Sequence, residues 1–129
     1  MDTKINAKIE SFTDLNFWKE AHKFVLMIYK LTKLFPKEEM FGLTSQIRRA
    51  AVSIVSNIAE GFSRRSYADK GQFYTIALGS LTEVQSQVLV ARDLNYLNNE
   101  NFNIVVNQAV IVSKLLNGLI KSSRFIHNS

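Results

Sequence analysis

The sequence predicts an all-α protein, an antiparallel up-down-up-down four-helix bundle with a single core. The 129 residues include one Pro and five Gly, so few positions interrupt long elements. Hydrophobic residues make up 47% of the chain, which is enough for one globular domain. Four segments carry apolar residues at helical spacing, and no segment alternates as a strand does. Amphipathic helices with short links bury their apolar faces most simply as a bundle.

The first predicted helix covers about residues 14–35 and follows a flexible N-terminal arm over residues 1–12. Thr13 and Asp14 are both good N-cap residues for its start. Pro36 sets its end, because a proline disfavours helical backbone at the residue before it. The apolar face of this helix contains Leu15, Trp18, Val25, Ile28, Tyr29 and Thr32.

The second and third predicted helices cover about residues 43–61 and 67–94. Gly61 is a natural C-cap for the second helix. Ser66 followed by Asp69 indicates a capping box at the start of the third. The buried stripe of the second helix is Leu43, Ile47, Ala50, Ala51, Ile54, Ile58 and Phe62. That of the third is Tyr67, Phe73 or Tyr74, Ala77, Leu81, Val84, Val88 and Ala91.

The fourth predicted helix covers about residues 99–123, with Asn98 or Asn99 as its cap. We expect the tail over residues 124–129 to be frayed, as chain ends usually are. The buried stripe of this helix is Phe102, Val105, Ala109, Val112, Leu116 and Leu119.

The residue inventory argues against an enzyme or a metal protein. The chain has no cysteine, and its two histidines, His22 and His127, are far apart in sequence. It contains no metalloprotease, P-loop or dinucleotide-binding motif. We therefore expect no catalytic residues, no cofactor and no metal. Because the N-terminus lacks an apolar signal region and no apolar run approaches about 20 residues, we expect a soluble cytoplasmic protein with no membrane partner.

The net charge of +5 and the sequence pI of about 9.6 favour an anionic partner such as RNA or DNA. Lysines of the first helix fall within about 80° of one another on a helical wheel. Such a ridge is either an ordinary solvated face or a surface that contacts phosphates without reading bases. The candidate nucleic-acid-binding residues are Lys19, Lys23, Lys30, Lys33, Arg48, Arg64, Arg65 and Lys70.

The second helix is more apolar than a monomeric bundle requires. Val52, Val55 and Ala59 lie outside its core stripe and widen the apolar arc to about 200°, whereas about 100° suffices for one core. The helix is either packed deeply among its neighbours or also faces another subunit. We favour self-association, which makes these three residues the candidate oligomer interface.

A polar arc less than about 90° wide runs along the same helix. It either lines a groove or forms an internal hydrogen-bond network with the third helix. We favour the network, in which Arg49 pairs with Glu83, because a semi-buried charged pair fixes the register between helices. The candidate network contains Gln46, Arg49, Ser53, Asn57, Glu60 and Glu83.

Three stretches resemble a known family: residues 17–36 (FWKEAHKFVLMIYKLTKLFP), 42–62 (GLTSQIRRAAVSIVSNIAEGF) and 77–85 (ALGSLTEVQ). They are similar to the four-helix-bundle proteins encoded in intervening sequences of bacterial 23S rRNA genes, also called S23-type proteins. The resemblance covers about residues 12–124. The residues that carry it are Gln46, Arg49, Ala50, Ser53, Asn57, Ile58, Ala59, Glu60, Gly61, Gly79, Ser80 and Glu83.

The resemblance implies a homopentamer with a central channel. The chain also resembles the accessory variability protein of diversity-generating retroelements, a pentameric basic barrel that binds nucleic acid and a reverse transcriptase. From the residues and the resemblance together, we expect a homo-oligomer that binds nucleic acid, with RNA favoured over DNA. The alternative is a protein-interaction scaffold that recruits a protein partner.

Overall fold

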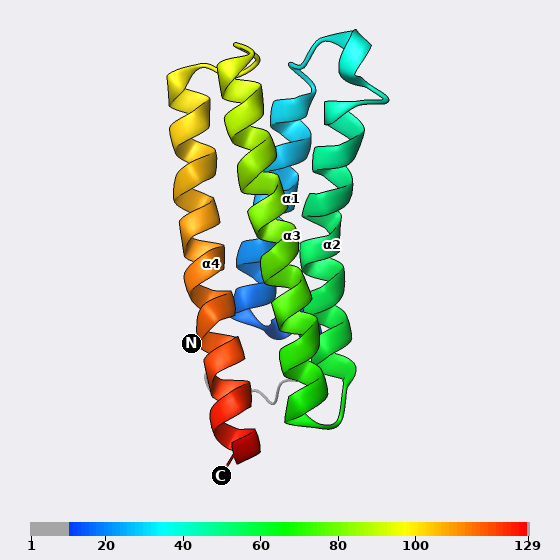
Figure 1. The fold of residues 1–129 in the computed structure, drawn as a ribbon, viewed down its shortest axis with the longest axis vertical. Helices are drawn as coiled ribbons and strands as arrows, with labels where there is room; N and C mark the ends of the chain where they lie inside the picture. The colour runs from blue at the N-terminus through cyan, green and yellow to red at the C-terminus, as the bar shows by residue number, and fades with distance from the viewer. Residues whose placement is uncertain (1–10, 129) are drawn as a thin grey trace, which may run out of the picture.

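The computed structural model describes residues 11–128, with side chains as far as Arg124. Four helices run alternately up and down in chain order (Figure 1), which confirms the predicted four-helix bundle. Two short 3-10 helices, η2 (Phe12–Asp14) and η3 (Lys37–Glu39), precede the first and second α-helices. The four helices are α1 (Asn16–Thr32), α2 (Leu43–Ser63), α3 (Tyr67–Asp93) and α4 (Asn99–Asn128).

The helices form a square. Within the described residues, each helix contacts the two that adjoin it in the order α1, α2, α3, α4 and back to α1, so α1 lies diagonally opposite α3 and α2 opposite α4. The bundle therefore has four lateral faces, and its α1–α2 face is opposite its α3–α4 face. The α1–α2 and α3–α4 loops lie at one end, and the α2–α3 loop lies at the other (Figure 1).

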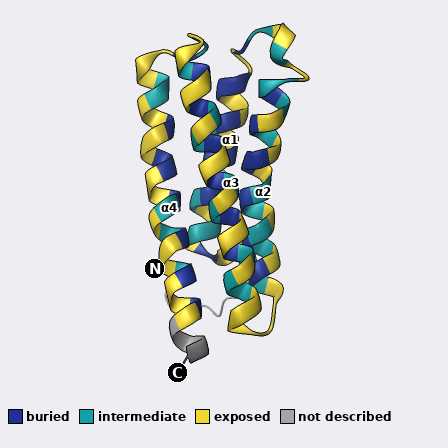
Figure 2. Cartoon of the chain, in the orientation of Figure 1, coloured by how far each residue is buried: buried dark blue, intermediate teal, exposed yellow. Residues whose placement is uncertain are grey.

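One hydrophobic core fills the square, and buried residues line the inward side of every helix (Figure 2). The predicted stripes of α2 and α3 supply most of its centre, as expected from their spacing. On α1 the prediction missed Phe24, which is fully buried, and included Tyr29, which is 37% exposed. The largest fully buried side chains are Phe24, Ile28, Ile47, Ile54, Ile58, Leu81, Leu116, Val84, Val105 and Val112.

The predicted N-cap residues of α3 and α4 are confirmed, but the described residues show only the Ser66 half of the predicted Ser66–Asp69 capping box. The Ser66 hydroxyl accepts a hydrogen bond from the Asp69 N–H at 3.1 Å, and Asn98 Oδ1 accepts one from the Asn101 N–H at 2.7 Å. Each cap satisfies one of the free N–H groups at a helix start.

The boundaries of α1 differ from the prediction. Ser11 caps the short helix η2 through a capping box with Asp14, so neither Thr13 nor Asp14 caps α1 itself, which begins at Asn16. The helix ends at Thr32 and not at Phe35. The predicted N-terminal arm lies outside the described residues except for its last two positions.

Gly61 is not a C-cap, because α2 continues through it to Ser63. It is buried against α3, where an added Cβ would lie 2.7 Å from Tyr74 Cε1. The glycine is needed for this close approach of two helices and not for a left-handed backbone. Lys70 serves the end of α2 instead, since its Nζ donates hydrogen bonds to the carbonyls of Gly61 (3.3 Å) and Phe62 (2.8 Å).

The fourth helix is longer than predicted and is helical to Asn128, which includes most of the tail expected to fray. Its segment Asn99–Arg124 is the one described stretch with the length and composition to cross a membrane. A core helix of a soluble protein passes the same test. In α4 the residues that recur on the inward side, such as Val105, Val112 and Leu116, belong to the core of the bundle.

Candidate functional site

Three lysines of α1, together with Lys33 directly after its last residue, form one exposed surface. The side of the helix opposite the buried Ala21 and Ile28 exposes Lys19, Lys23, Lys30 and Lys33, which span about 21 Å at 1.5 Å per residue. Within the described residues none of the four ammonium groups makes a hydrogen bond or an ion pair. We call this surface the lysine ridge, and its four ammonium groups are available to an anionic partner.

An acidic residue of α1 is directed away from the ridge. Gln108 of α4, itself buried, donates through Nε2 to the Glu20 carbonyl at 2.9 Å and to Glu20 Oε1 at 3.2 Å. The carboxylate of Glu20 is thus held toward α4. The ridge therefore keeps its positive charge.

Arg48, another predicted phosphate-binding residue, joins α2 to α1. Its Nε donates to Thr32 Oγ1 at 2.8 Å, and its guanidinium lies 4.8 Å from the centre of the Tyr29 ring. The side chain is half-buried. These contacts give Arg48 a structural role that leaves its guanidinium little freedom.

The basic cluster near the α2–α3 loop is also mostly engaged. Arg64 pairs with Glu60 at 3.2 Å and lies over the Phe73 ring. Lys70 caps α2, and burial lowers the pKa of its ammonium group. Arg65 is exposed and has no partner among the described residues. Of the eight predicted contact residues, the structure groups the four lysines in the ridge. It leaves Arg65 free in the α2–α3 loop, at the end of the bundle where α1 begins.

The predicted polar network is built in part. The Ser53 and Ser80 hydroxyls lie 2.8 Å apart and join α2 to α3. Asn57 Nδ2 donates to the Ser53 carbonyl at 2.8 Å and to its hydroxyl at 3.0 Å. Glu60 contacts Arg64 and Ser63 instead of joining this network.

The predicted pairing of Arg49 with Glu83 is wrong. The ion pairs among the described residues are Arg64–Glu60 and Arg92–Asp93. Both Arg49 and Glu83 are exposed, and with Gln46 they line an open polar cavity of about 350 Å³ between α2 and α3. Because both side chains are exposed to water, an ion pair between them would add little stability, which explains why it is not formed.

The predicted oligomer residues of α2 differ in exposure. Val52 is 39% exposed, whereas Val55 and Ala59 are half-buried and Val55 packs against the core. Deep packing therefore accounts for much of the wide apolar arc. Val52 lines a mixed groove of about 590 Å³ on the α1–α2 face, which also includes Tyr29, Arg48 and several hydroxyl side chains.

The sequence reasoning missed the hydrophobic side chain that is most exposed among the described residues. Phe41, in the α1–α2 loop, is 96% exposed, and the neighbouring Met40 is 56% exposed. The available signal was an aromatic residue inside a short connection bounded by Pro36 and Gly42, where no core stripe could bury it. We call Phe41 with Met40 the apolar knob.

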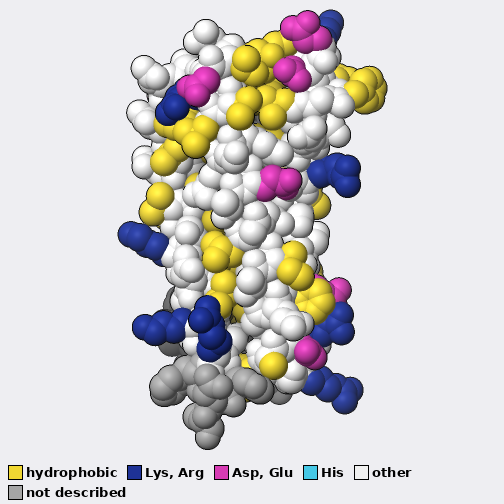
Figure 3. Space-filling view, viewed as in Figure 1, with side chains coloured by type: hydrophobic (Ala, Val, Ile, Leu, Met, Phe, Trp, Pro, Cys, Tyr) yellow, Lys and Arg dark blue, Asp and Glu magenta, His cyan; other side chains and the backbone are white. Residues whose placement is uncertain are grey.

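A second missed feature is an apolar groove of about 230 Å³ between α3 and α4. Its rims are Leu89 and Val106, which are 44% and 36% exposed, and its floor includes Val88 and Phe102. Figure 3 shows hydrophobic side chains exposed on α4 and along its border with α3. We call this feature the α3–α4 groove.

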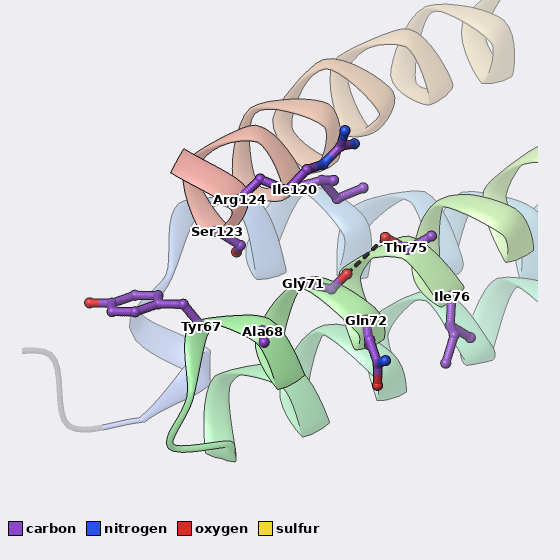
Figure 4. A pocket seen from close by; sticks show the side chains of 9 residues that line it. All are labelled: Tyr67, Ala68, Gly71, Gln72, Thr75, Ile76, Ile120, Ser123 and Arg124. Carbon is purple, nitrogen blue, oxygen red and sulfur yellow. Dashed lines mark hydrogen bonds between the residues drawn. The ribbon is translucent and has the colours of Figure 1, made fainter. Parts of the chain in front are cut away.

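A third groove, of about 470 Å³, lies between the start of α3 and the far part of α4 (Figure 4). The helices come close there, since an added Cβ at Gly71 would lie 3.3 Å from Ser123 Cβ. Ile76, Ile120 and Arg124 are among its lining residues. Within the part of the chain that the structure describes, no three His, Cys, Asp or Glu side chains gather as a metal site would require.

Comparisons with known proteins give a family and a fold. A family model described as "23S rRNA-intervening sequence protein" matches residues 13–118. The chain is similar to the crystal structure of a protein with unknown function from the S23 ribosomal protein family of Bacteroides thetaiotaomicron. That similarity has a TM-score of 0.76 and 26% identity, and it covers 81% of this chain and 98% of the other. None of the curated proteins compared with the chain matches it.

Proposed function

Because the chain belongs to the 23S rRNA-intervening sequence protein family, we propose that it is a non-catalytic, homo-oligomeric bundle that binds nucleic acid, RNA in preference to DNA. The observation that carries the proposal is the lysine ridge of α1, whose four exposed ammonium groups have no partner among the described residues. The preference for RNA follows the family resemblance.

Recognition would use the phosphate backbone. Lysines contact phosphates as point charges and release counterions, which gives affinity without base selectivity. Stacking of bases on Trp18 is not supported, because its ring already stacks on His22 at 4.8 Å and packs against the core. The partner would therefore be selected by the shape and charge of its backbone.

Self-association strengthens this function. One ridge offers four lysines, which is a small electrostatic footprint. Several ridges on one particle would bind a long anionic chain with the avidity of linked sites. The number of subunits suggested by the resemblance is five, and the relation to the accessory variability protein stays a prediction.

The proposal is tested by mobility shift of a structured RNA and of a DNA duplex of the same sequence, over a series of salt concentrations. We expect binding that weakens steeply as salt rises, with the RNA bound more tightly. Absence of any shift at low salt, with folded protein, would overturn the proposal. Equal affinity for the RNA and for the DNA duplex would overturn the preference for RNA.

The exposed apolar surface supports a second candidate function, a scaffold that recruits a protein. Leu89, Val106 and Val110 are 36–44% exposed on adjoining parts of α3 and α4, and apolar patches of this kind mark protein interfaces. A pull-down from nuclease-treated lysate separates the two functions. A different protein retained in stoichiometric amount, together with no binding to purified RNA, would favour the scaffold.

A further inference from the structure

We propose that the α1–α2 face of one subunit packs against the α3–α4 face of a second copy, with Phe41 inserted into the α3–α4 groove. This inference rests on the homo-oligomer proposed above and assigns the surfaces that build it. Four observations lead to it: an apolar knob on a braced loop, an apolar groove of suitable chemistry, their placement on opposite faces, and the area available.

The knob is held in place. Glu39, two residues before Phe41, accepts a hydrogen bond from the Leu43 N–H at 3.2 Å and one from the Tyr96 hydroxyl at 2.8 Å. The loop is thereby fixed to the start of α2 and to the α3–α4 loop. A braced loop loses little backbone conformational entropy on binding, so more of the hydrophobic free energy of burying Phe41 would appear in the affinity.

The α3–α4 groove suits an aromatic ring better than the groove beside Phe41 does. Its lining is hydrophobic apart from Gln85. The groove on the α1–α2 face contains Arg48, Arg49 and several hydroxyl groups, and an inserted ring would remove water from these groups without pairing them. The chemistry therefore favours contact between two different faces over contact of the α1–α2 face with itself.

The placement of the two features matches such a contact. The knob and the groove are on opposite faces of the square, and both lie toward the end of the bundle that carries the α1–α2 and α3–α4 loops (Figure 1). Subunits that stand side by side with parallel axes can therefore insert each knob into the next groove at the same height. A contact between two different surfaces forms a ring when the rotation between copies closes.

The faces are large enough for a stable interface. The 21 residues of α2 give a length of about 31 Å, and two adjoining helices give a width of about 20 Å. The flat outline of a face is therefore roughly 600 Å², close to the roughly 800 Å² of accessible surface that each partner buries in a standard interface. Tyr29 and Val52 on one face, and Val110 on the other, extend the apolar contact.

The first experiment measures the mass of the particle by light scattering after gel filtration. We expect Phe41→Ser and Leu89→Arg each to convert the oligomer to the 14.7 kDa subunit, while circular dichroism shows unchanged helix content. Matched controls are Leu34→Ser, which removes another highly exposed side chain two residues past α1, and Val90→Arg, which adds the same charge beside Leu89. Both controls should remain oligomeric.

The second experiment mixes the two monomeric variants. The Leu89→Arg subunit keeps its knob and the Phe41→Ser subunit keeps its groove, so one intact contact remains for each mixed pair. We expect a particle of twice the subunit mass and nothing larger. If the α1–α2 face instead packed against itself, Leu89→Arg would leave that contact intact, and the Leu89→Arg protein would associate without the Phe41→Ser subunit.

The results distinguish failure of the knob-in-groove interface from failure of the homo-oligomer itself. If wild-type protein is oligomeric and both variants stay oligomeric, the knob-in-groove interface is wrong, although the proposed homo-oligomer stands. If wild-type protein is itself a 14.7 kDa monomer, both the interface and the homo-oligomer are wrong.

Discussion

The Tyr96 hydroxyl donates a 2.8 Å hydrogen bond to Glu39 Oε2, across 57 residues of sequence. This bond joins the α3–α4 loop to the α1–α2 loop, and so it braces the loop that carries Phe41. Packing of the Tyr96 ring beside Phe35, with ring centres 5.4 Å apart, supports the same contact.

The contact predicts a pH-dependent stability that Tyr96→Phe should remove. The hydrogen bond from Tyr96, followed by that from the Leu43 N–H, lowers the pKa of the Glu39 carboxyl below its ordinary value of 4.5. A carboxyl with a lowered folded pKa contributes stability above its unfolded pKa and loses it as the pH falls through the folded value. Wild type should exceed Tyr96→Phe in stability at pH 7, and the difference should shrink below pH 4.5.

Urea unfolding of both proteins between pH 3 and pH 8 measures this difference. The same hydrogen bond raises the pKa of Tyr96 above its ordinary value of 10.0, so the hydroxyl stays protonated and the bond intact throughout that range. A difference that stays constant from pH 7 to pH 3 would contradict the role assigned to Glu39.

Two glycines should respond in opposite directions to alanine. At Gly61 an added Cβ would lie 2.7 Å from Tyr74 Cε1 and 3.2 Å from Phe73 Cβ, so Gly61→Ala should destabilise the protein by about 1–3 kcal/mol through overpacking. At Gly79 the space is open, and Gly79→Ala should stabilise the protein by about 0.5–1 kcal/mol through helix propensity. Chemical denaturation measures both, and a stabilised Gly61→Ala variant would argue against the close α2–α3 approach.

If the lysine ridge binds RNA, removing its charges should weaken binding more than removing the same number of charges elsewhere on the protein. The triple variant Lys23→Gln, Lys30→Gln and Lys33→Gln should bind RNA more weakly and lower the slope of log K against log salt by about two to three per bound subunit. The matched control changes the three exposed basic residues Lys114, Lys121 and Arg124 of α4 to Gln, which removes the same charge.

Salt-dependent filter binding of wild type and both triple variants distinguishes the outcomes. The α4 variant should keep most of the wild-type slope. Equal losses in both variants would mean that net charge, and not the ridge, determines affinity.

Lys70 should affect stability more than binding. Its Nζ caps two carbonyls at the end of α2, so Lys70→Met should lower the unfolding free energy by about 1 kcal/mol. Arg65→Met removes the same charge from an exposed side chain without a partner among the described residues, and should leave stability nearly unchanged. Thermal unfolding of the two variants checks the contrast, and equal stabilities would remove the capping role from Lys70.

The absence of cysteine allows a direct test of the proposed subunit contact. In the double variant Met40→Cys and Gln85→Cys, which keeps both Phe41 and Leu89, a short bis-maleimide reagent should link Cys pairs between neighbouring copies and produce a ladder of covalent multimers. The largest band would count the subunits in the ring. Either single variant should give no ladder, and a double variant that stays uncrosslinked while oligomeric would contradict the contact.

The helices could be predicted because their inward positions repeat with the helical period and their caps, Ser66 and Asn98, are local signals. The role of Gly61 could not, since a glycine near a helix end reads as a cap until the Tyr74 ring on the next helix is placed. The prediction of an Arg49–Glu83 ion pair was wrong for a related reason. The helical wheel places both residues near the α2–α3 seam but does not say whether they lie inside it.

The surface features were harder to predict from the sequence than the helices and the core. The wheel identified the lysine ridge, because its outward side is set by the core stripe of α1. It could not show that Arg48 is bound to Thr32 and Tyr29, or that Phe41 stands free of the core, because both facts depend on how the ends of the bundle meet. The α3–α4 groove joins residues of two helices, and no single-helix pattern reveals it.

The placement of the loops has a consequence for the whole particle. If neighbouring copies meet through opposite faces at a common height, every subunit points the same way, and the assembly has two unlike rims. One rim presents the braced α1–α2 and α3–α4 loops; the other presents the α2–α3 loops, with Arg64 and Arg65 repeated around it (Figure 1). Such a particle has a direction, and a strand that threads or crosses it would meet one rim before the other.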